Sequence, residues 1–108
     1  HGTATIKGDL AESKAVNEIF GDYHVPVSST KGATGHMMGA GGITEVITCI
    51  KAIHTGILPA NSNLTQKDEQ CNLNLIVNEP MHNEIDIAMS NSFGFGGQNS
   101  CIIVGRYI

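Results

Sequence analysis

One run of apolar residues at helical spacing constrains the fold more than any other feature. Its members stand at positions i, i+3, i+4, i+7 and i+10, and they are Ile43, Val46, Ile47, Ile50 and Ile53. This period predicts a helix that ends near Gly56 and Pro59. The helix is apolar enough to be mostly buried, and the small residues 39–42 before it would let another backbone approach closely.

Shorter patterns on both sides of this helix predict a second helix and several strands. We expect a helix over 10–20, where Asp9 and Glu12 resemble a capping box and Gly21 ends the last turn. Its apolar face would hold Ala15, Val16, Ile19 and Phe20. The other predictions are strands over 25–30, 73–77, 85–89 and 101–104, a surface connection over 57–70 and a turn over 81–84. This mixture predicts an α/β fold whose sheet ends in an antiparallel hairpin.

Composition narrows the class of protein. A chain of 108 residues is long enough for one domain with one core. Six Lys and Arg against ten Asp and Glu give a net charge of −4, which argues against nucleic-acid binding. No apolar stretch approaches the roughly 18 residues of a membrane span, and no signal-peptide pattern is present, so we expect a soluble, non-secreted protein. The scattered cysteines, Cys49, Cys71 and Cys101, fit core thiols in a reducing compartment.

Three glycine-rich polar stretches are the candidate ligand-binding segments. They read HGTAT (1–5), SSTKGATGH (28–36) and NSFGFGGQN (91–99). Each follows a predicted strand or precedes a predicted helix, where open α/β sheets place their ligands, so the three could meet at one site. Glycine and small polar residues also suit ordinary turns, and each stretch alone is open to that interpretation. The spacing of their glycines matches neither of the common phosphate-binding motifs, which argues against a nucleotide site.

Two histidines and a lysine in these stretches are the candidate reactive groups. His1 and His36 stand among small residues, and Lys31 precedes the second of them. We expect no metal site, because no third ligand stands at a helical or hairpin spacing from either histidine. Neutral imidazoles can donate hydrogen bonds to a carbonyl oxygen that gains negative charge, which suits enolate chemistry. The remaining histidines are expected on the surface, and they are His24, His54 and His82.

In this order, the stretches HGTAT, SSTKGATGHMMGAGG and SNSFGFGGQN resemble the three C-terminal signatures of the β-ketoacyl-[acyl carrier protein] synthases. The elongating type is favoured, because initiating synthases have His and Asn where this chain has two histidines. The resemblance implies a thiolase-like fold, with this chain forming most of its C-terminal half. Residues 1–108 would be a partial C-terminal domain, inactive alone, because the nucleophilic cysteine of the family lies upstream and none of the three cysteines here occupies such a setting.

The resemblance also implies roles for the reactive groups. His1 and His36 would belong to a Cys-His-His triad and would hold the thioester carbonyl of the malonyl carrier as it loses CO2. Lys31 matches the active-site lysine of the family, and we expect Glu45 to be its charge partner. The alternatives are that Glu45 is an ordinary helix residue and Lys31 a solvated loop lysine.

Further residues match the substrate-binding parts of the family. Thr3 and Thr5 match the threonines that hydrogen-bond the phosphopantetheine arm, although they could instead cap local backbone. Phe95 matches the gating phenylalanine, whose N–H forms half of the oxyanion hole; otherwise it would be a core aromatic under a hairpin turn. Its loop would gain freedom to move from Gly94, Gly96 and Gly97.

Two positions depart from the usual pattern of the family. Ile6 stands where proline is usual, and Gly32 stands where serine is common after the lysine. Both departures lie beside predicted site residues, Thr5 and Lys31.

The function implied by the resemblance is fatty acid elongation by decarboxylative condensation of an acyl-enzyme with malonyl-acyl carrier protein. The substrate would arrive on the phosphopantetheine of the carrier, no cofactor or metal would be bound, and the full protein would be a homodimer. We expect it in a bacterial cytoplasm, a plastid or a mitochondrion. The alternatives are a catalytically silent partner similar to chain-length factors, and a non-catalytic binding domain. A separation of His1 and His36 beyond about 10 Å would favour the binding domain, because each hydrogen bond reaches only about 3 Å.

Overall fold

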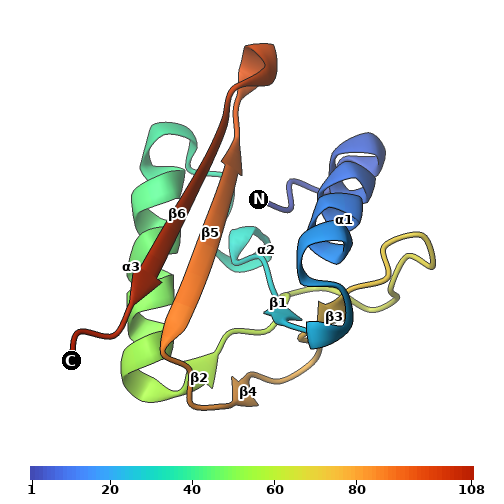
Figure 1. Cartoon of the computed structure of the whole chain (residues 1–108). Helices are drawn as coiled ribbons and strands as arrows, with labels where there is room; N and C mark the ends of the chain where they lie inside the picture. The colour runs from blue at the N-terminus through green and yellow to red at the C-terminus, as the bar shows by residue number, and fades with distance from the viewer. The chain divides into compact units, whose positions relative to one another are not determined.

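The computed structural model describes residues 1–108, apart from the side chain of Asp22. The helices are α1 (Ile6–Phe20), α2 (Lys31–Thr34) and α3 (Gly41–Thr55). The strands are β1 (Pro26–Val27), β2 (Ile57–Leu58), β3 (Asn74–Leu75), β4 (Met81–His82), β5 (Ile87–Phe93) and β6 (Asn99–Gly105) (Figure 1). Three 3-10 turns are also present: η1 (Gly21–Tyr23) follows α1, η2 (Met38–Ala40) precedes α3, and η3 (Phe95–Gly97) lies between β5 and β6. The chain forms two compact units. Residues 1, 36–58 and 81–108 make the hairpin unit, and residues 2–35 and 59–80 make the α1 unit.

In the hairpin unit, a long antiparallel hairpin lies alongside α3 (Figure 1). Strands β5 and β6 pair from Ile87 opposite Gly105 to Phe93 opposite Asn99. Ser90, on the face that meets α3, donates its hydroxyl hydrogen to Glu45 Oε2 at 3.2 Å. After α3 the chain turns at Gly56, whose φ of 70° is left-handed, and enters β2, which pairs antiparallel with β4. The sheet pairing and one helix therefore define this unit.

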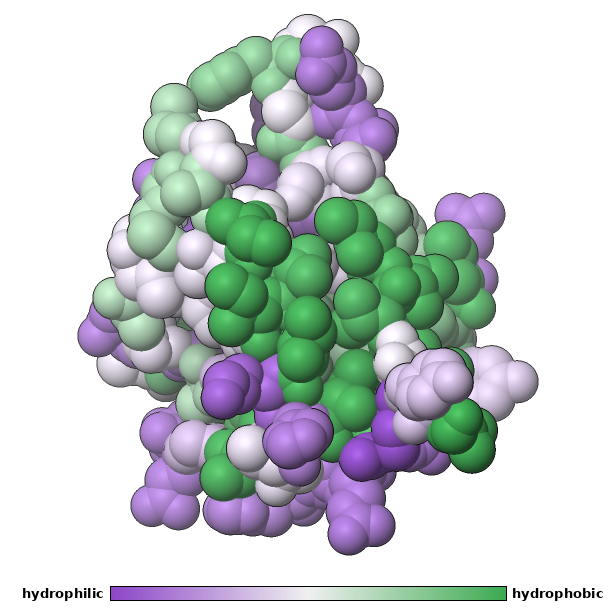
Figure 2. Space-filling view, turned by 90° about the vertical axis from the view of Figure 1, so that its left-hand side faces the viewer, coloured by the Kyte–Doolittle hydropathy of each residue, from purple (hydrophilic) through white to green (hydrophobic). Residues whose placement is uncertain are grey.

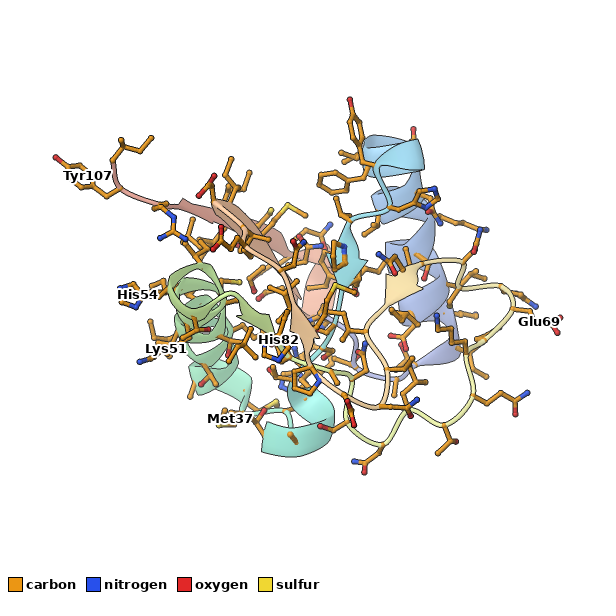
Figure 3. The ribbon with its side chains drawn as sticks, turned by 90° about the horizontal axis from the view of Figure 1, so that it is seen from below. Met37, Lys51, His54, Glu69, His82 and Tyr107 are labelled. Carbon is orange, nitrogen blue, oxygen red and sulfur yellow. The ribbon has the colours of Figure 1, made fainter. Side chains whose placement is uncertain are left out.

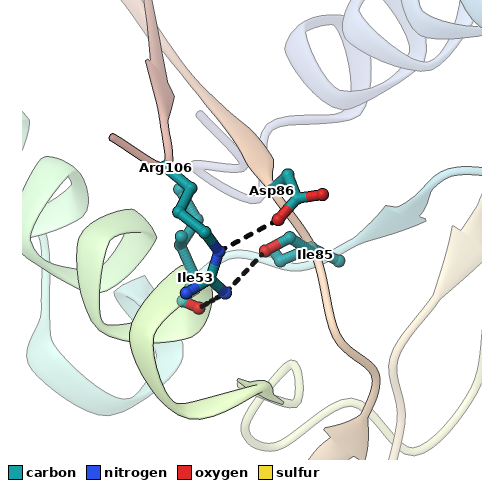
Figure 4. Close-up of polar contacts among 4 residues, drawn as sticks. All are labelled: Ile53, Ile85, Asp86 and Arg106. Carbon is teal, nitrogen blue, oxygen red and sulfur yellow. Dashed lines mark hydrogen bonds and ion pairs between the residues drawn. The ribbon is translucent and has the colours of Figure 1, made fainter. Parts of the chain in front are cut away.

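Arg106 ties the end of α3 to the hairpin (Figure 4). Its guanidinium donates to the carbonyl of Ile53 at 2.6 Å and to Asp86 Oδ1 at 2.9 Å. Ile53 stands in the last turn of α3, where carbonyls have no partner within the helix and carry partial negative charge. The arginine therefore satisfies a helix end and complements its dipole.

The hairpin unit buries little and leaves a broad apolar face open. Its buried apolar residues are Ala52, Ile53 and Leu58. Along α3, Ile43, Ile47 and Ile50 form an exposed stripe at positions i, i+4 and i+7. Exposed apolar residues elsewhere in the unit include Ile57, Ile87, Met89, Ile102 and Ile103. Figure 2 shows the apolar side chains gathered on the side of the molecule that holds α3.

In the α1 unit, α1 begins at a side-chain cap and buries one narrow face. Thr5 is the N-cap, and its hydroxyl oxygen accepts from the N–H of Gly8 at 3.2 Å. The buried positions of α1 are Ser13 and Val16, and Ser13 Oγ donates to the carbonyl of Asp9 at 2.7 Å. The parallel pair of β1 and β3 is only two residues long on each side.

Gly2 is held tightly in the same unit. Its N–H donates to Glu12 Oε2 at 3.0 Å, and its carbonyl accepts from Ser29 Oγ at 3.4 Å. Its φ is +56°, and an added Cβ would lie 2.7 Å from Cβ of Ser29. Both the backbone angle and the close approach therefore require glycine here.

Several predictions of local structure are confirmed, and others are corrected. The mixed α/β fold and the final antiparallel hairpin are confirmed, and the middle helix lies at 41–55 as expected. The first helix begins four residues earlier than predicted, at Ile6, because Thr5 and not Asp9 caps it. Ile6 takes the first helical position, where proline is favoured, and the threonine cap starts the helix without it.

Other corrections concern burial and the extent of strands. Much of the α3 stripe is exposed, so the prediction that this helix is mostly buried is wrong. On the apolar face expected for α1, Ala15 and Ile19 are exposed as well. The strands predicted over 25–30 and 73–77 shrink to β1 and β3, whereas the hairpin strands are longer than predicted. The segment 81–84, predicted as a turn, contains β4, and Leu58 of the predicted surface connection is buried in β2. Of the cysteines, Cys101 is exposed and the other two are only half-buried.

Candidate active site

Two histidines from distant parts of the sequence meet in the hairpin unit. The ring centroids of His1 and His36 lie 5.7 Å apart, with the ring planes nearly perpendicular at 88°. This separation is well inside the limit of about 10 Å that allows one oxygen to contact both rings. Phe93, at the end of β5, makes a T-shaped ring contact with His1, with a centroid distance of 5.3 Å and an angle of 62° between the ring planes. The phenyl ring of Phe93 and the two imidazole rings therefore lie together in one cluster.

The hydrogen bond of His36 fixes the form of its neutral ring. The backbone N–H of Met38 donates to Nδ1 of His36 at 3.1 Å. We infer the tautomer from this contact: in the neutral ring an Nδ1 that accepts carries no proton, so the proton is on Nε2. The ring itself is exposed. Nε2 is therefore a hydrogen-bond donor that can face a ligand oxygen.

Other histidines and the predicted charge partner occupy ordinary positions. His24, His54 and His82 are exposed, as predicted, and His54 projects from the outer side of α3 near Lys51 (Figure 3). Glu45 is half-buried on α3, where its carboxylate accepts from Ser90. Burial and the nearby charge of Glu45 both raise the pKa of the Cys49 thiol, one turn further along α3. The pairing of Glu45 with Lys31 stays a prediction.

Lys31 and the two threonines belong to the α1 unit. Lys31 is half-buried at the first position of α2, and its N–H donates to Ser29 Oγ at 3.4 Å. Thr3 is half-buried, whereas Thr5 is exposed and caps α1. The capping that we considered as an alternative therefore holds for Thr5, and binding of a pantetheine arm by either threonine stays a prediction.

The glycine-rich loop at the tip of the hairpin carries Phe95. The side chain of Phe95 is 90% exposed, so the alternative of a core aromatic under the turn is wrong. Gly96 and Gly97 have φ of 76° and 79°, a left-handed conformation that requires glycine, while Gly94 is extended and its N–H donates to the carbonyl of Gln98. The loop is thus a tight glycine turn that presents an aromatic ring, and its gating role stays a prediction.

Sequence reasoning missed Phe93 of the hairpin unit and, in the α1 unit, a contact of Glu12. Phe93 lies inside the quoted stretch 91–99, and the two-residue period of Ile87 and Met89 continues through it if the strand is extended to its true end. Glu12, which holds the N–H of Gly2, had been interpreted only as part of a capping box. No local pattern signals that second contact, because it joins residues ten apart.

Among residues 1–108, leaving aside the Asp22 side chain, no group of three or more His, Cys, Asp or Glu gathers as metal ligands would. Within the described part of the chain, no helix has the length and apolar character needed to cross a membrane.

Comparisons with known proteins agree on one family. Residues 1–65 match the family described as beta-ketoacyl synthase, C-terminal domain. The chain is 44% identical over 108 residues to a 3-oxoacyl-[acyl-carrier-protein] synthase 2 of Coxiella burnetii, covering 98% of this chain and 26% of the relative. A crystal structure of a beta-ketoacyl synthase from Burkholderia phymatum superposes with a TM-score of 0.93 at 37% identity, covering 100% of this chain and 26% of that one.

A second solved structure is also similar. A chain of the ishigamide ketosynthase/chain length factor gives a TM-score of 0.94 at 34% identity, covering 99% of this chain and 27% of that one. The fold is therefore the thiolase-like α/β fold of the ketosynthases, and the chain spans about a quarter of the length of the relatives it matches. With three ordered motifs, two adjacent imidazoles and a matching fold, this chain belongs to the β-ketoacyl synthase family.

Proposed function

We propose that this chain is the C-terminal part of a longer elongating β-ketoacyl synthase and supplies the two histidines of its active site. The observation that carries the proposal is the 5.7 Å separation of the His1 and His36 rings, which come from opposite ends of a 36-residue stretch. Relatives named 3-oxoacyl-[acyl-carrier-protein] synthase, the Coxiella protein among them, support the reaction class.

The chemistry follows from what two imidazoles can do for one oxygen. When malonyl thioester loses CO2, the bond between its central carbon and carboxyl carbon breaks, and the electron pair forms an enolate. Donors placed on the enolate oxygen stabilise this charge, as in an oxyanion hole. The enolate carbon then attacks the carbonyl carbon of an acyl group held as a thioester on a cysteine of the longer protein, and the thiolate leaves. The product is longer by two carbons.

Other parts of the proposal concern substrate delivery. Lys31 would supply positive charge at the site, and Thr3 and Thr5 would bind the phosphopantetheine arm of acyl carrier protein. Phe95 would gate the acyl channel through the glycine turn that carries it. We further propose a homodimer, with no cofactor or metal bound besides the carrier's own arm.

The test is the release of CO2 from malonyl-acyl carrier protein by the complete protein that carries this chain. His36→Ala should slow the release about 100-fold or more, the usual effect of removing one oxyanion donor. The unfolding midpoint should change little, because the side chain is exposed. His54→Ala, a change at another exposed histidine, is the matched control and should retain the normal rate. Normal release by His36→Ala would remove His36 from the mechanism.

The similarity to the ishigamide ketosynthase/chain length factor favours a second candidate, a catalytically silent partner. Such a partner would keep the fold but form no acyl-enzyme. Incubation of the complete protein with an acyl donor, followed by mass spectrometry, separates the two candidates. A thioester-linked acyl group on a cysteine supports the enzyme, and its absence supports the silent partner.

A further inference from the structure

Asn61 holds the backbone just beyond the short parallel pair of β1 and β3. Its side-chain NH2 donates to the carbonyls of Val27 at 3.2 Å and Ile76 at 3.0 Å. Its Oδ1 accepts from the N–H of Ser29 at 2.8 Å. Its own N–H also donates to the carbonyl of Ile76, at 2.8 Å. One half-buried carboxamide thus continues, with side-chain atoms, the hydrogen bonding that the two strands stop providing.

Asn63 makes a second contact on the other side of Lys31. Its side-chain NH2 donates to the carbonyl of Gly32 at 3.0 Å. Asn63 has a φ of +66°, a left-handed conformation that asparagine tolerates better than most residues. At Gly32 an added Cβ would lie 2.6 Å from the carbonyl oxygen of Ser62. The loop 61–63 therefore lies against the backbone of 27–32 so closely that the glycine at 32 is needed.

These contacts hold the backbone on both sides of Lys31 in the sequence. The N–H of Ser29 and the carbonyl of Gly32 are both fixed by asparagine side chains, and the lysine lies between them. Helix α2 has only four residues, and so short a helix is not stable by itself. Contacts with other segments must therefore hold α2 in position. The asparagine amides supply contacts at both ends of the segment.

We propose that Asn61 and Asn63 are positioning residues that act on the reaction through Lys31. The inference rests on the proposed function, because it assumes that Lys31 works in the condensation site. Neither asparagine touches substrate. They fix the backbone from which the lysine side chain extends, so their loss should misplace its charge and should slow the reaction more than it weakens binding.

The experiment measures CO2 release from malonyl-acyl carrier protein by the complete protein, for single and paired variants. Asn61→Ala removes the carboxamide, and Asn63→Gly removes one hydrogen bond while it keeps the left-handed backbone free of strain. We expect kcat to fall about tenfold and about threefold respectively, with KM nearly unchanged, as for small misplacements of a charged group. Asn17→Ala is the matched control, because its side chain also donates to a distant backbone carbonyl, that of Asn72 at 2.9 Å. The control should keep a normal kcat.

The paired variants separate positioning from general loss of stability. If the asparagines act through Lys31, then Asn61→Ala and Asn63→Gly should cause little further loss in a Lys31→Ala background. Equal losses in both backgrounds would overturn the inference. A normal kcat in both asparagine variants, with an impaired Lys31→Ala variant, would also overturn the inference. The proposed function would remain in that case. If Asn61→Ala fails to fold, the kinetics of Asn63→Gly in the two backgrounds are sufficient to test the inference. A normal rate for Lys31→Ala would overturn both the proposed role of the lysine and the inference.

Discussion

The two units of the chain hold their backbones by different means. In the hairpin unit, β5 and β6 pair along seven residues each, and the backbone supplies its own partners. In the α1 unit, the only described strand pair is two residues long, and side chains such as Asn61 and Glu12 bond the backbone instead. A single substitution should therefore disturb the backbone more in the α1 unit than in the hairpin unit, where each bond is one of many.

The largest expected effect in this comparison is that of Gly2→Ala. The change adds a Cβ 2.7 Å from Cβ of Ser29 and places alanine at a φ of +56°. Strain at a left-handed residue and overpacking each cost about 1–3 kcal/mol, so we expect roughly 2–6 kcal/mol of lost stability. Denaturant unfolding of the complete protein measures this loss.

The control for Gly2→Ala is a glycine in the hairpin unit. At Gly39 no described atom lies within 4 Å of an added Cβ, and its φ is not left-handed. Gly39→Ala should change stability by less than about 1 kcal/mol. Equal effects at the two glycines would break the comparison between the units.

A smaller effect is expected at Arg106, where the hairpin unit also relies on a side chain. Arg106→Met keeps the apolar stem but removes the bond to the carbonyl of Ile53, and we expect a loss of about 1–2 kcal/mol. Asp86→Asn should cost less than about 0.5 kcal/mol, because this carboxylate is 82% exposed. Thermal unfolding at low and high salt checks both. If Asp86→Asn lost more stability than Arg106→Met, the stabilising contact of Arg106 would be the ion pair with Asp86 and not the hydrogen bond to the end of α3.

The smallest expected effect concerns the thiol of Cys49 in the hairpin unit. Burial and the charge of Glu45 raise its pKa, so at pH 8 it has less thiolate than an ordinary cysteine. Glu45→Gln removes one of the two causes, which lowers the pKa and should speed alkylation of Cys49 about twofold to threefold. Mass spectrometry of the complete protein follows the rate, with Cys101 as internal reference. An unchanged rate would mean that the carboxylate does not act on the thiol.

The same contrast explains which parts of the fold could be predicted from the sequence. The α3 helix and the hairpin follow from periodicity, and both were predicted, although the hairpin strands were drawn too short. Strands β1 and β3 were predicted too long, because β-branched residues at 25–30 and apolar residues at 73–77 indicate strands even where side chains take over the bonding. Short α2 has no pattern that a local rule can detect.

Prediction of the candidate site had a similar limit. His1 and His36 were expected close together for two reasons: their stretches stand at predicted strand or helix ends that could share one site, and the three motifs together resemble a family. No local pattern joins residues so far apart in the sequence. Phe93 and the two asparagines were missed, because their contacts depend on tertiary packing. The exposed stripe of Ile43, Ile47 and Ile50 was predicted to be buried, because apolar spacing marks a face without identifying what covers it.

The most direct test of the account is a double-variant cycle on the two imidazoles. Rates of CO2 release from malonyl-acyl carrier protein would be measured for the complete protein with His1→Ala, His36→Ala and both changes together. If the rings act on one oxygen, the double variant should be about as slow as the slower single variant, with a coupling of at least about tenfold. If the two losses multiply, the histidines act independently, and the shared site is contradicted.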